Sequence, residues 1–193
     1  MTTTQGRRRT ARQVALLDEL VALMAAEGFA AFTLDDLAER LRCSKTTLYQ
    51  LAGSKQELVV EVVKQYFRAA VEAVEPQVAR VTDPVERVDV YLRAVAAHLQ
   101  PLSRAFMADL QDFGPAADVY RRNTEAAADR IRGLIADGIE AGAFRPVHAA
   151  FMGEMVAATM FGIQSGQLSG RLGMTDSEAY AELASTVVVA LTA

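Results

Sequence analysis

The chain has 193 residues, of which 51% are hydrophobic and 23% are charged, with 5 Pro and 1 Cys. This composition suits a globular protein with a sizeable core, and it excludes a disordered chain. One cysteine excludes an internal disulfide and a multi-cysteine zinc site, and it favours a cytoplasmic protein. The net charge is −4, but residues 1–55 carry eight basic against six acidic side chains, whereas the remainder carries twelve against eighteen.

Targeting segments are not expected. The basic run from Arg7 to Arg9 precedes an apolar stretch, as in a secretory signal, but Asp18 and Glu19 interrupt that stretch. The longest apolar runs, such as residues 155–163, have about half of the roughly 20 residues that a membrane-spanning helix needs. We therefore expect no membrane partner.

Apolar residues recur every three or four positions, and Ala is abundant, so we predict an all-α protein of about nine helices. The first helix is predicted from near Arg12 to Gly28, with Val14, Leu17, Val21 and Met24 on its buried stripe. A capping box of Thr33 and Asp36 opens a short helix to residue 41. After a tight turn, Ser44 caps a second short helix over residues 45–51.

Proline and capping residues predict the later helices. A box from Ser54 to Glu57 opens a long helix toward Val74, before Pro76, and Asp83-Pro84 opens a helix that ends near His98 or Gln100. Three more starts are marked by Pro101, Pro115 and Pro146, and the helix after Pro115 is the longest of the C-terminal part, stopping at Gly142. The last two helices are predicted over residues 147–169 and 175–191, the final one opened by the box Thr175-Asp176-Ser177-Glu178.

The two short helices predict a helix-turn-helix, in which the second helix enters a DNA major groove. Leu48 and Leu51 turn inward, while the outer face carries the hydroxyl, amide and cationic groups that contact phosphates and base edges. The predicted DNA contacts on this face are Ser44, Lys45, Thr46, Thr47, Tyr49 and Gln50. Lys55 adds a cation at the next helix N-terminus, where the helix dipole also favours a phosphate.

Two features nearby have alternative interpretations. Arg7, Arg8, Arg9 and Arg12 either contact phosphates or the minor groove as a flexible arm, or belong to a solvated tail. Cys43, in the predicted turn, is either an oxidant-sensitive thiol or a small buried hydrophobic residue.

Four segments follow one another in a distinctive order and spacing: Gly28-Phe29, Thr33-Leu34-Asp35-Asp36-Leu37-Ala38, Ser44-Lys45-Thr46-Thr47-Leu48-Tyr49 and Ser54-Lys55-Gln56-Glu57-Leu58. Over roughly residues 10 to 60, they resemble the N-terminal DNA-binding domain of the TetR family. The resemblance implies a homodimer of all-helical subunits that binds a near-palindromic operator, usually as a repressor, and releases it when a small molecule enters the C-terminal domain. It also implies DNA contacts by Thr33, Thr46, Thr47, Tyr49 and Lys55. Ala52 departs from the family pattern, which commonly has an aromatic residue there, so packing against the fourth helix is expected to differ.

Ten of the thirteen Phe and Tyr residues follow residue 56. Most of them must be core, but a ligand chamber lined by aromatic, Met and a few polar side chains has the same appearance in sequence. The predicted lining is Tyr66, Tyr91, His98, Phe106, Met107, Phe113, Tyr120, Asn123, Met155 and Thr159. His98 and His148 lack the spacing of a helical metal site, so no metal and no cofactor are expected.

Small residues recur every four positions at Ala158, Gly162, Gly166 and Gly170. Such a strip allows another helix to approach closely. We predict that it forms a dimer interface together with Leu183, Val187 and Leu191 of the final helix. The alternative is close packing inside one subunit, because interface and core share the same chemistry.

The helix-turn-helix pattern favours a DNA-binding regulator. The resemblance further implies a ligand-responsive repressor whose partners are double-stranded operator DNA, a small-molecule effector and a second copy of the chain. Residues 1–55 would form the DNA-binding domain, and residues 56–193 the ligand-binding and dimerisation domain. An enzyme is not expected, because the sequence has no Gly-rich phosphate loop or nucleophile motif. The alternative is a helical ligand-binding dimer that has lost specific DNA binding.

Overall fold

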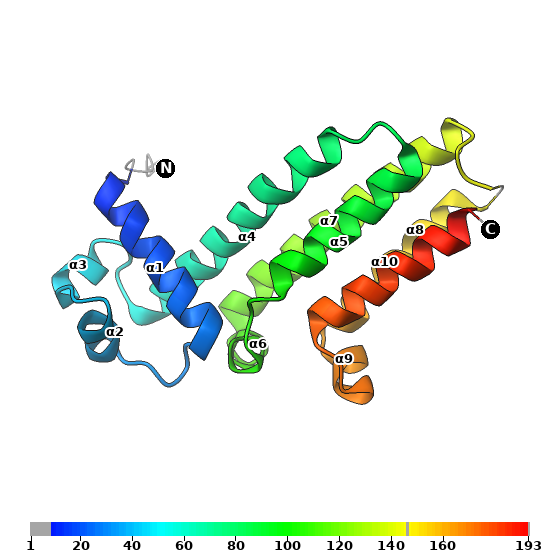
Figure 1. The fold of residues 1–193 in the computed structure, drawn as a ribbon. Coiled ribbons are helices and arrows are strands. Elements are labelled where there is room, and N and C mark those ends of the chain that lie inside the picture. The colour runs from blue at the N-terminus through cyan, green and yellow to red at the C-terminus, as the bar shows by residue number, and fades with distance from the viewer. Residues whose placement is uncertain (1–8, 146, 193) are drawn as a thin grey trace, which may run out of the picture.

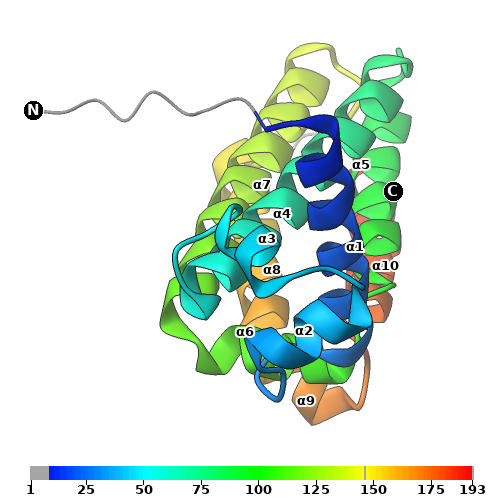
Figure 2. The same cartoon turned by 90° about the vertical axis from the view of Figure 1, so that its left-hand side faces the viewer.

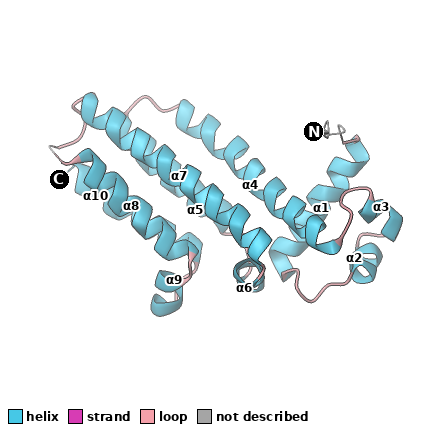
Figure 3. Cartoon of the chain, turned by 180° about the vertical axis from the view of Figure 1, so that it is seen from behind, coloured by secondary structure: helices cyan, strands magenta, loops and turns pink. Residues whose placement is uncertain are grey.

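The computed structural model describes residues 9–145 and 147–192, with the side chains of Ala149 and Ser169 left aside. This part of the chain forms ten α-helices and no strand, as Figures 1 and 3 show, so the predicted all-α class is confirmed. The helices are α1 (Ala11–Glu27), α2 (Leu34–Arg40), α3 (Lys45–Tyr49), α4 (Lys55–Ala79), α5 (Pro84–Leu99), α6 (Arg104–Asp112), α7 (Gly114–Glu140), α8 (Ala149–Gln164), α9 (Gln167–Leu172) and α10 (Asp176–Thr192).

Side-chain caps begin most of these helices where the sequence places a hydroxyl or a carboxylate. Thr33 caps α2 in a box with Asp36, Ser44 caps α3 and Ser54 caps α4. At α10, the Thr175 hydroxyl accepts from the Glu178 amide at 3.2 Å, while the Glu178 carboxylate accepts from the Thr175 amide at 2.7 Å. Each cap satisfies backbone N–H groups that the first turn of a helix leaves without an internal partner, which is why local sequence predicts these boundaries well.

Several predicted boundaries were wrong in detail. The first helix begins at Ala11, next to the predicted start near Arg12, with a capping box of Thr10 and Gln13, but Val14 on its predicted buried stripe is 41% exposed. Pro76 lies inside α4, which continues to Ala79. The predicted helix over residues 147–169 ends at Gln164, since Gly166 has a φ of +70°, a left-handed conformation that glycine adopts without steric cost. The predicted start at Pro146 lies outside the described residues.

The helices form two regions joined by α4 (Figure 1). We call α1 to α3 the head and α5 to α10 the bundle; Figure 2 views the molecule with the head in front. In the bundle, α5 packs mainly against α10, and α7 against α8, while α4 covers α5 and α7. Buried side chains form one continuous core from Leu17 in the head to Leu191 in α10. Because α4 packs against α1 of the head and against α5 and α7 of the bundle, it positions the head relative to the bundle.

Candidate DNA-binding site and interior cavity

The helices α2 and α3 are held at a fixed angle by a tight turn and a shared core. Arg42 adopts a left-handed φ of +49°, and the Cys43 amide donates to the Ala38 carbonyl at 2.9 Å. Leu37 of α2 and Leu48 of α3 are 0% and 1% exposed, and Leu51 is also buried, as predicted. The inner side of α3 is therefore anchored, which leaves its other side free for a ligand as large as DNA.

The predicted DNA-contacting residues of α3 divide into two groups. Thr46, Tyr49 and Gln50 are exposed, Tyr49 to 51%, so they form its outward face. Ser44 and Thr47 are engaged with each other, because the Ser44 hydroxyl caps the Thr47 amide at 3.1 Å and lies 2.8 Å from the Thr47 hydroxyl. The polar side chains here that are most available to a partner are therefore those of Thr46, Tyr49 and Gln50.

Charged and capping residues flank this face. Lys45 Nζ lies 2.6 Å from the Asp35 carboxylate of α2, and the hydrogen bond to Asp35 raises the pKa of Lys45. Thr33 is used as the cap of α2, where it donates to the Asp36 carboxylate at 2.7 Å. Lys55 Nζ donates to the Ala30 carbonyl at 2.9 Å, so in the free protein it orders the loop after α1. These three side chains have partners within the subunit that DNA phosphates would compete with.

A hollow of about 660 Å³ separates the start of α1 from α3. Arg12, Thr47 and Gln50 line it, which places one arginine of the predicted basic arm beside the recognition helix. Arg9 also borders the hollow but forms a 2.6 Å ion pair with Glu61 of α4. Arg7 and Arg8 lie outside the described residues.

Cys43 and Ala52 lie on either side of α3 in the sequence, and both are half-buried. Burial raises the pKa of the Cys43 thiol, with Glu19 adding to the effect, whereas a reactive thiol needs a lowered pKa. Ala52 is half-buried and borders a surface hollow with Val60 and Phe113, so the space that a larger residue would fill is open. Neither feature alters the outward face of α3.

A joint between α1 and α6 connects the head to the bundle. The Asp109 carboxylate of α6 accepts from the amides of Phe29 and Ala30, at 2.5 and 2.8 Å. Gly28 has a φ of +82°, and a Cβ there would lie 2.6 Å from Asp109 Oδ2, so glycine is required both for the conformation and for the space. We call this arrangement the Asp109 clasp. It fixes the end of α1 to a helix of the bundle.

The bundle encloses a cavity of about 270 Å³ between α4, α5, α7 and α10. Its walls are mainly apolar and aromatic, with a few polar groups: Phe67, Ala70, Val71, Val74, Glu75, Tyr91, Val95, His98, Leu99, Tyr120, Asn123, Thr124, Ala126, Ala127, Arg130 and Tyr180. The Phe67 and Tyr120 rings are stacked at 5.2 Å. Val71 is 54% exposed and marks the side that faces solvent.

Only part of the predicted ligand lining reaches this cavity. Four of the ten residues line it: Tyr91, His98, Tyr120 and Asn123. Tyr66 is adjacent, since its hydroxyl donates to the His98 carbonyl and its ring lies 4.6 Å from the imidazole. The others lie elsewhere: Phe106 is core, Met107 and Phe113 border surface hollows, Met155 is 37% exposed and Thr159 donates to the Met155 carbonyl. Sequence reasoning missed Glu75, Arg130 and Tyr180, because periodicity alone does not show which helix faces meet.

Most polar groups of the cavity are already paired. The Arg130 guanidinium binds the Glu75 carboxylate through two hydrogen bonds of 3.0 Å, the Tyr91 hydroxyl donates to the Ala127 carbonyl at 3.2 Å, and the Thr124 hydroxyl donates to the Tyr120 carbonyl. Burial raises the pKa of Tyr91 and lowers that of His98, which favours the neutral form of both. His98 Nε2 is the exception among these groups: it is buried and has no hydrogen-bond partner in the described part of the chain.

The predicted dimer residues do not form one surface. Ala158 and Gly162 lie on α8, but Gly166 and Gly170 follow its end, so the four-residue strip is broken. Leu183, Val187 and Leu191 are 7%, 0% and 0% exposed and pack within the subunit, where α10 contacts α5 and α8. Exposed apolar side chains instead occur at Phe151 and Met155 on α8 and Val189 on α10. The part of the strip on α8 continues their exposed face at Ala158.

Residues 9–145 and 147–192 contain neither a metal-ligand cluster nor a membrane-spanning helix. No group of three or more His, Cys, Asp or Glu residues in these ranges is arranged to hold a metal ion. None of the described helices has the length and apolarity needed to cross a bilayer.

The helices α2 and α3 and the turn between them form a helix-turn-helix whose second helix exposes a polar face. Residues 16–62 match the model of the bacterial regulatory proteins of the tetR family. The predicted resemblance of this segment to the N-terminal DNA-binding domain of the family is confirmed. No curated protein matches the chain.

Solved structures of the same fold cover nearly the whole chain. A TetR transcription regulator from Haloarcula marismortui has 19% identity and a TM-score of 0.75, covering 94% of this chain and 99% of that one. PfmR, a TetR-family regulator from Thermus thermophilus, has 22% identity and a TM-score of 0.64, covering 92% and 99%. A transcriptional regulator from Saccharomonospora viridis, in complex with choline, has 16% identity and a TM-score of 0.71, covering 93% and 96%. At these identities, the likeness shows the fold.

Proposed function

We propose that this protein is a repressor that binds a near-palindromic operator and releases it when a small molecule enters the bundle cavity. Residues 1–55 act as the DNA-binding domain, and residues 56–193 as the ligand-binding and dimerisation domain, in the cytoplasm. The observation that carries the proposal is the outward face of α3, where Thr46, Tyr49 and Gln50 are exposed while Leu48 behind them is 1% exposed. Such a face is available to base edges in a major groove.

A mobility-shift assay on DNA upstream of the protein's own gene tests this function. Thr46→Val keeps the shape of the side chain but removes its hydroxyl, so it is expected to change the preferred operator sequence. Lys45→Ala removes a phosphate contact, so it is expected to weaken binding to all sequences and to lower the salt slope by about one. Equal losses on every operator variant for both proteins would contradict this division of roles.

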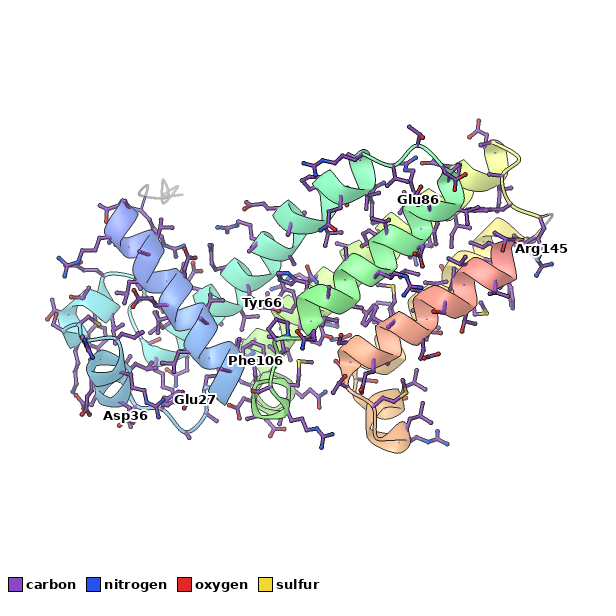
Figure 4. All side chains as sticks on the ribbon, viewed as in Figure 1. Glu27, Asp36, Tyr66, Glu86, Phe106 and Arg145 are labelled. Atoms are coloured by element: carbon purple, nitrogen blue, oxygen red, sulfur yellow. The ribbon has the colours of Figure 1, made fainter. Side chains whose placement is uncertain are left out.

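A chain of aromatic contacts connects the cavity to the head and supports release by a ligand. His98 lines the cavity and packs on Tyr66, whose ring centroid is 6.3 Å from that of Phe106. Phe106 meets Phe29 of the head edge-on at 5.7 Å, beside the Asp109 clasp. Figure 4 shows Tyr66 and Phe106 where the head adjoins the bundle. A ligand that displaces His98 therefore acts on packed groups that extend to the end of α1.

The second copy of the chain docks on the exposed face of α8 and α10. Phe151 and Val189 are 66% and 62% exposed, Met155 lies one turn after Phe151, and Ala158 follows on the same side of α8. Apolar side chains grouped on one face favour association, and a twofold axis would place two α3 helices for two half-sites. This face replaces the predicted one at Leu183, Val187 and Leu191.

The second candidate is a ligand-binding dimer that has lost specific DNA binding, and the open hollow at Ala52 is the observation that favours it. The mobility-shift assay separates the two, because this candidate binds ligand without retarding any upstream DNA. An enzyme is a third class; turnover of a bound small molecule would identify it.

A further inference from the structure

The cavity contains one buried polar atom without a partner, and its surroundings restrict what can pair with it. His98 Nε2 is inaccessible to solvent and has no hydrogen bond in the described residues, although buried polar groups are nearly always paired. The imidazole is held in place by the Tyr66 ring at 4.6 Å and by the Tyr66 hydroxyl, which donates to the His98 carbonyl. His98 lines the cavity, so a ligand that displaces the imidazole from this position can supply the missing partner with its polar group.

The charged groups of the cavity are satisfied without a ligand. The Arg130 guanidinium and the Glu75 carboxylate face each other through two hydrogen bonds, so the pair is close to neutral as a unit. A ligand carboxylate would have to displace Glu75, and a ligand cation would have to displace Arg130. Either exchange leaves one charge of the pair without its partner, which disfavours a charged ligand, although side chains that are 35% and 40% exposed are partly screened by solvent.

The size and the walls of the cavity limit the rest of the ligand. Its volume of about 270 Å³ is below the 300–1,000 Å³ that is usual for pockets of drug-sized ligands. The walls include the stacked rings of Phe67 and Tyr120 and the aliphatic side chains of Val74 and Val95. Such walls favour a compact apolar body, and aromatic rings pack well against one another.

We propose that the effector is a compact, uncharged, largely apolar molecule with one hydroxyl or carbonyl group that pairs with His98 Nε2, as in a simple phenol. This inference rests on the proposed function, because it specifies the ligand of the same cavity. His98 is then the residue that determines specificity: it selects the polar end of the ligand, while the rings and aliphatic side chains accept its body. Asn123 of α7 also lines the cavity and can pair with a second polar atom of the ligand.

The test is isothermal calorimetry of the full chain with four probes of similar size: phenol, toluene, benzoate and choline. Phenol is expected to bind about tenfold more tightly than toluene, which matches its shape but lacks the hydroxyl, and benzoate and choline are expected to bind more weakly than phenol. In His98→Leu, the preference for phenol over toluene should disappear while toluene binding persists, which shows that the cavity is intact. In His98→Gln, which restores a polar group, the preference should partly return.

Two calorimetric results would overturn the proposal. A phenol-to-toluene ratio that is unchanged in His98→Leu overturns the proposal, and so does tighter binding of benzoate or choline than of phenol. A mobility-shift assay with the same probes separates this result from the proposed function. If phenol binds through His98 but DNA is not released, the inferred ligand class stands and the proposed release mechanism fails. If choline or benzoate releases DNA, the release mechanism stands and the inferred ligand class fails.

Discussion

Breaking the Asp109 clasp is the most direct test of how the head is attached to the bundle. In Asp109→Asn, the side chain keeps its size but loses its charge and one of its two carboxylate oxygens. The amides of Phe29 and Ala30 both donate to the same carboxylate oxygen, Oδ2, at 2.5 and 2.8 Å. The carbonyl oxygen of asparagine can take that place, but it is a neutral acceptor and forms weaker hydrogen bonds than a carboxylate. Phe29 remains in its ring contact with Phe106, so the joint loosens without losing its core.

Hydrogen bonds to a charged group contribute about 1.5–3 kcal/mol each, and Asp109 is half-buried, so we expect a loss of about 1.5 kcal/mol in the free energy of unfolding. For a chain of about this size, each kcal/mol lowers Tm by about 2–4 °C, which predicts a decrease of about 3–6 °C. The assay is thermal unfolding followed by circular dichroism. Operator affinity, measured in parallel, should also fall, because the position of α1 is less well fixed.

Asp112→Asn is the matched control, since it makes the same change on an exposed residue of the same helix. It is expected to leave Tm within about 1 °C of the unsubstituted protein. If Asp109→Asn and Asp112→Asn have the same Tm and the same operator affinity, the clasp does not stabilise the joint, and the reasoning from its geometry is refuted.

Three further predictions concern charge, protonation and assembly. Asp35→Asn removes the carboxylate that lies 2.6 Å from Lys45, so binding to DNA of any sequence should tighten and the salt slope should rise by about one. Burial lowers the pKa of His98 below its ordinary 6.5, so the unfolded state binds a proton more readily than the folded state. The stability conferred by the neutral imidazole should therefore decrease as the pH falls below about 6.5. In urea unfolding, His98→Gln should remove that part of the pH dependence. Ala158→Arg should make the protein monomeric by light scattering, whereas Leu172→Arg, at a 64% exposed site on α9, should leave the dimer intact.

Each of these has a contradicting outcome. Glu182→Gln on α10 controls for net charge, and an equal gain in DNA affinity there would show that the effect of Asp35 is not local. Parallel pH profiles of the unsubstituted and His98→Gln proteins would mean that His98 does not contribute to the pH dependence. A dimer that survives Ala158→Arg would exclude the α8 face as its centre.

The head was largely predictable because its structure depends on contacts between residues close in sequence. Capping boxes reach only three residues along the chain, and Thr33 with Asp36 or Ser44 with Thr47 can be read directly. The spacing of Leu37, Leu48 and Leu51 also shows which side of each short helix is buried. The same rules missed the box of Thr10 and Gln13, although the signal was present in the sequence.

The bundle was less predictable because the periodicity of one helix does not show which neighbouring helix covers its apolar face. Leu183, Val187 and Leu191 have the periodicity of an interface, yet they are buried in the subunit, since α10 packs against α5 and α8. Phe106 and Tyr91 are both buried aromatic residues, but only Tyr91 lines the cavity. Such differences depend on how long helices cross, which local sequence does not specify.

The sequence by itself determined an all-helical chain, the positions of most helix starts and the polar face of the recognition helix. The tertiary structure decided the rest: that Asp109 reaches the amides of residues 29 and 30, that Glu75 meets Arg130, and that His98 Nε2 is buried without a partner beside a mainly apolar cavity. The physical reason is the separation along the chain of the residues that interact. Caps and periodicity act within one helix, whereas a clasp, an ion pair or a cavity exists only when residues separated by 50 or more positions are brought together.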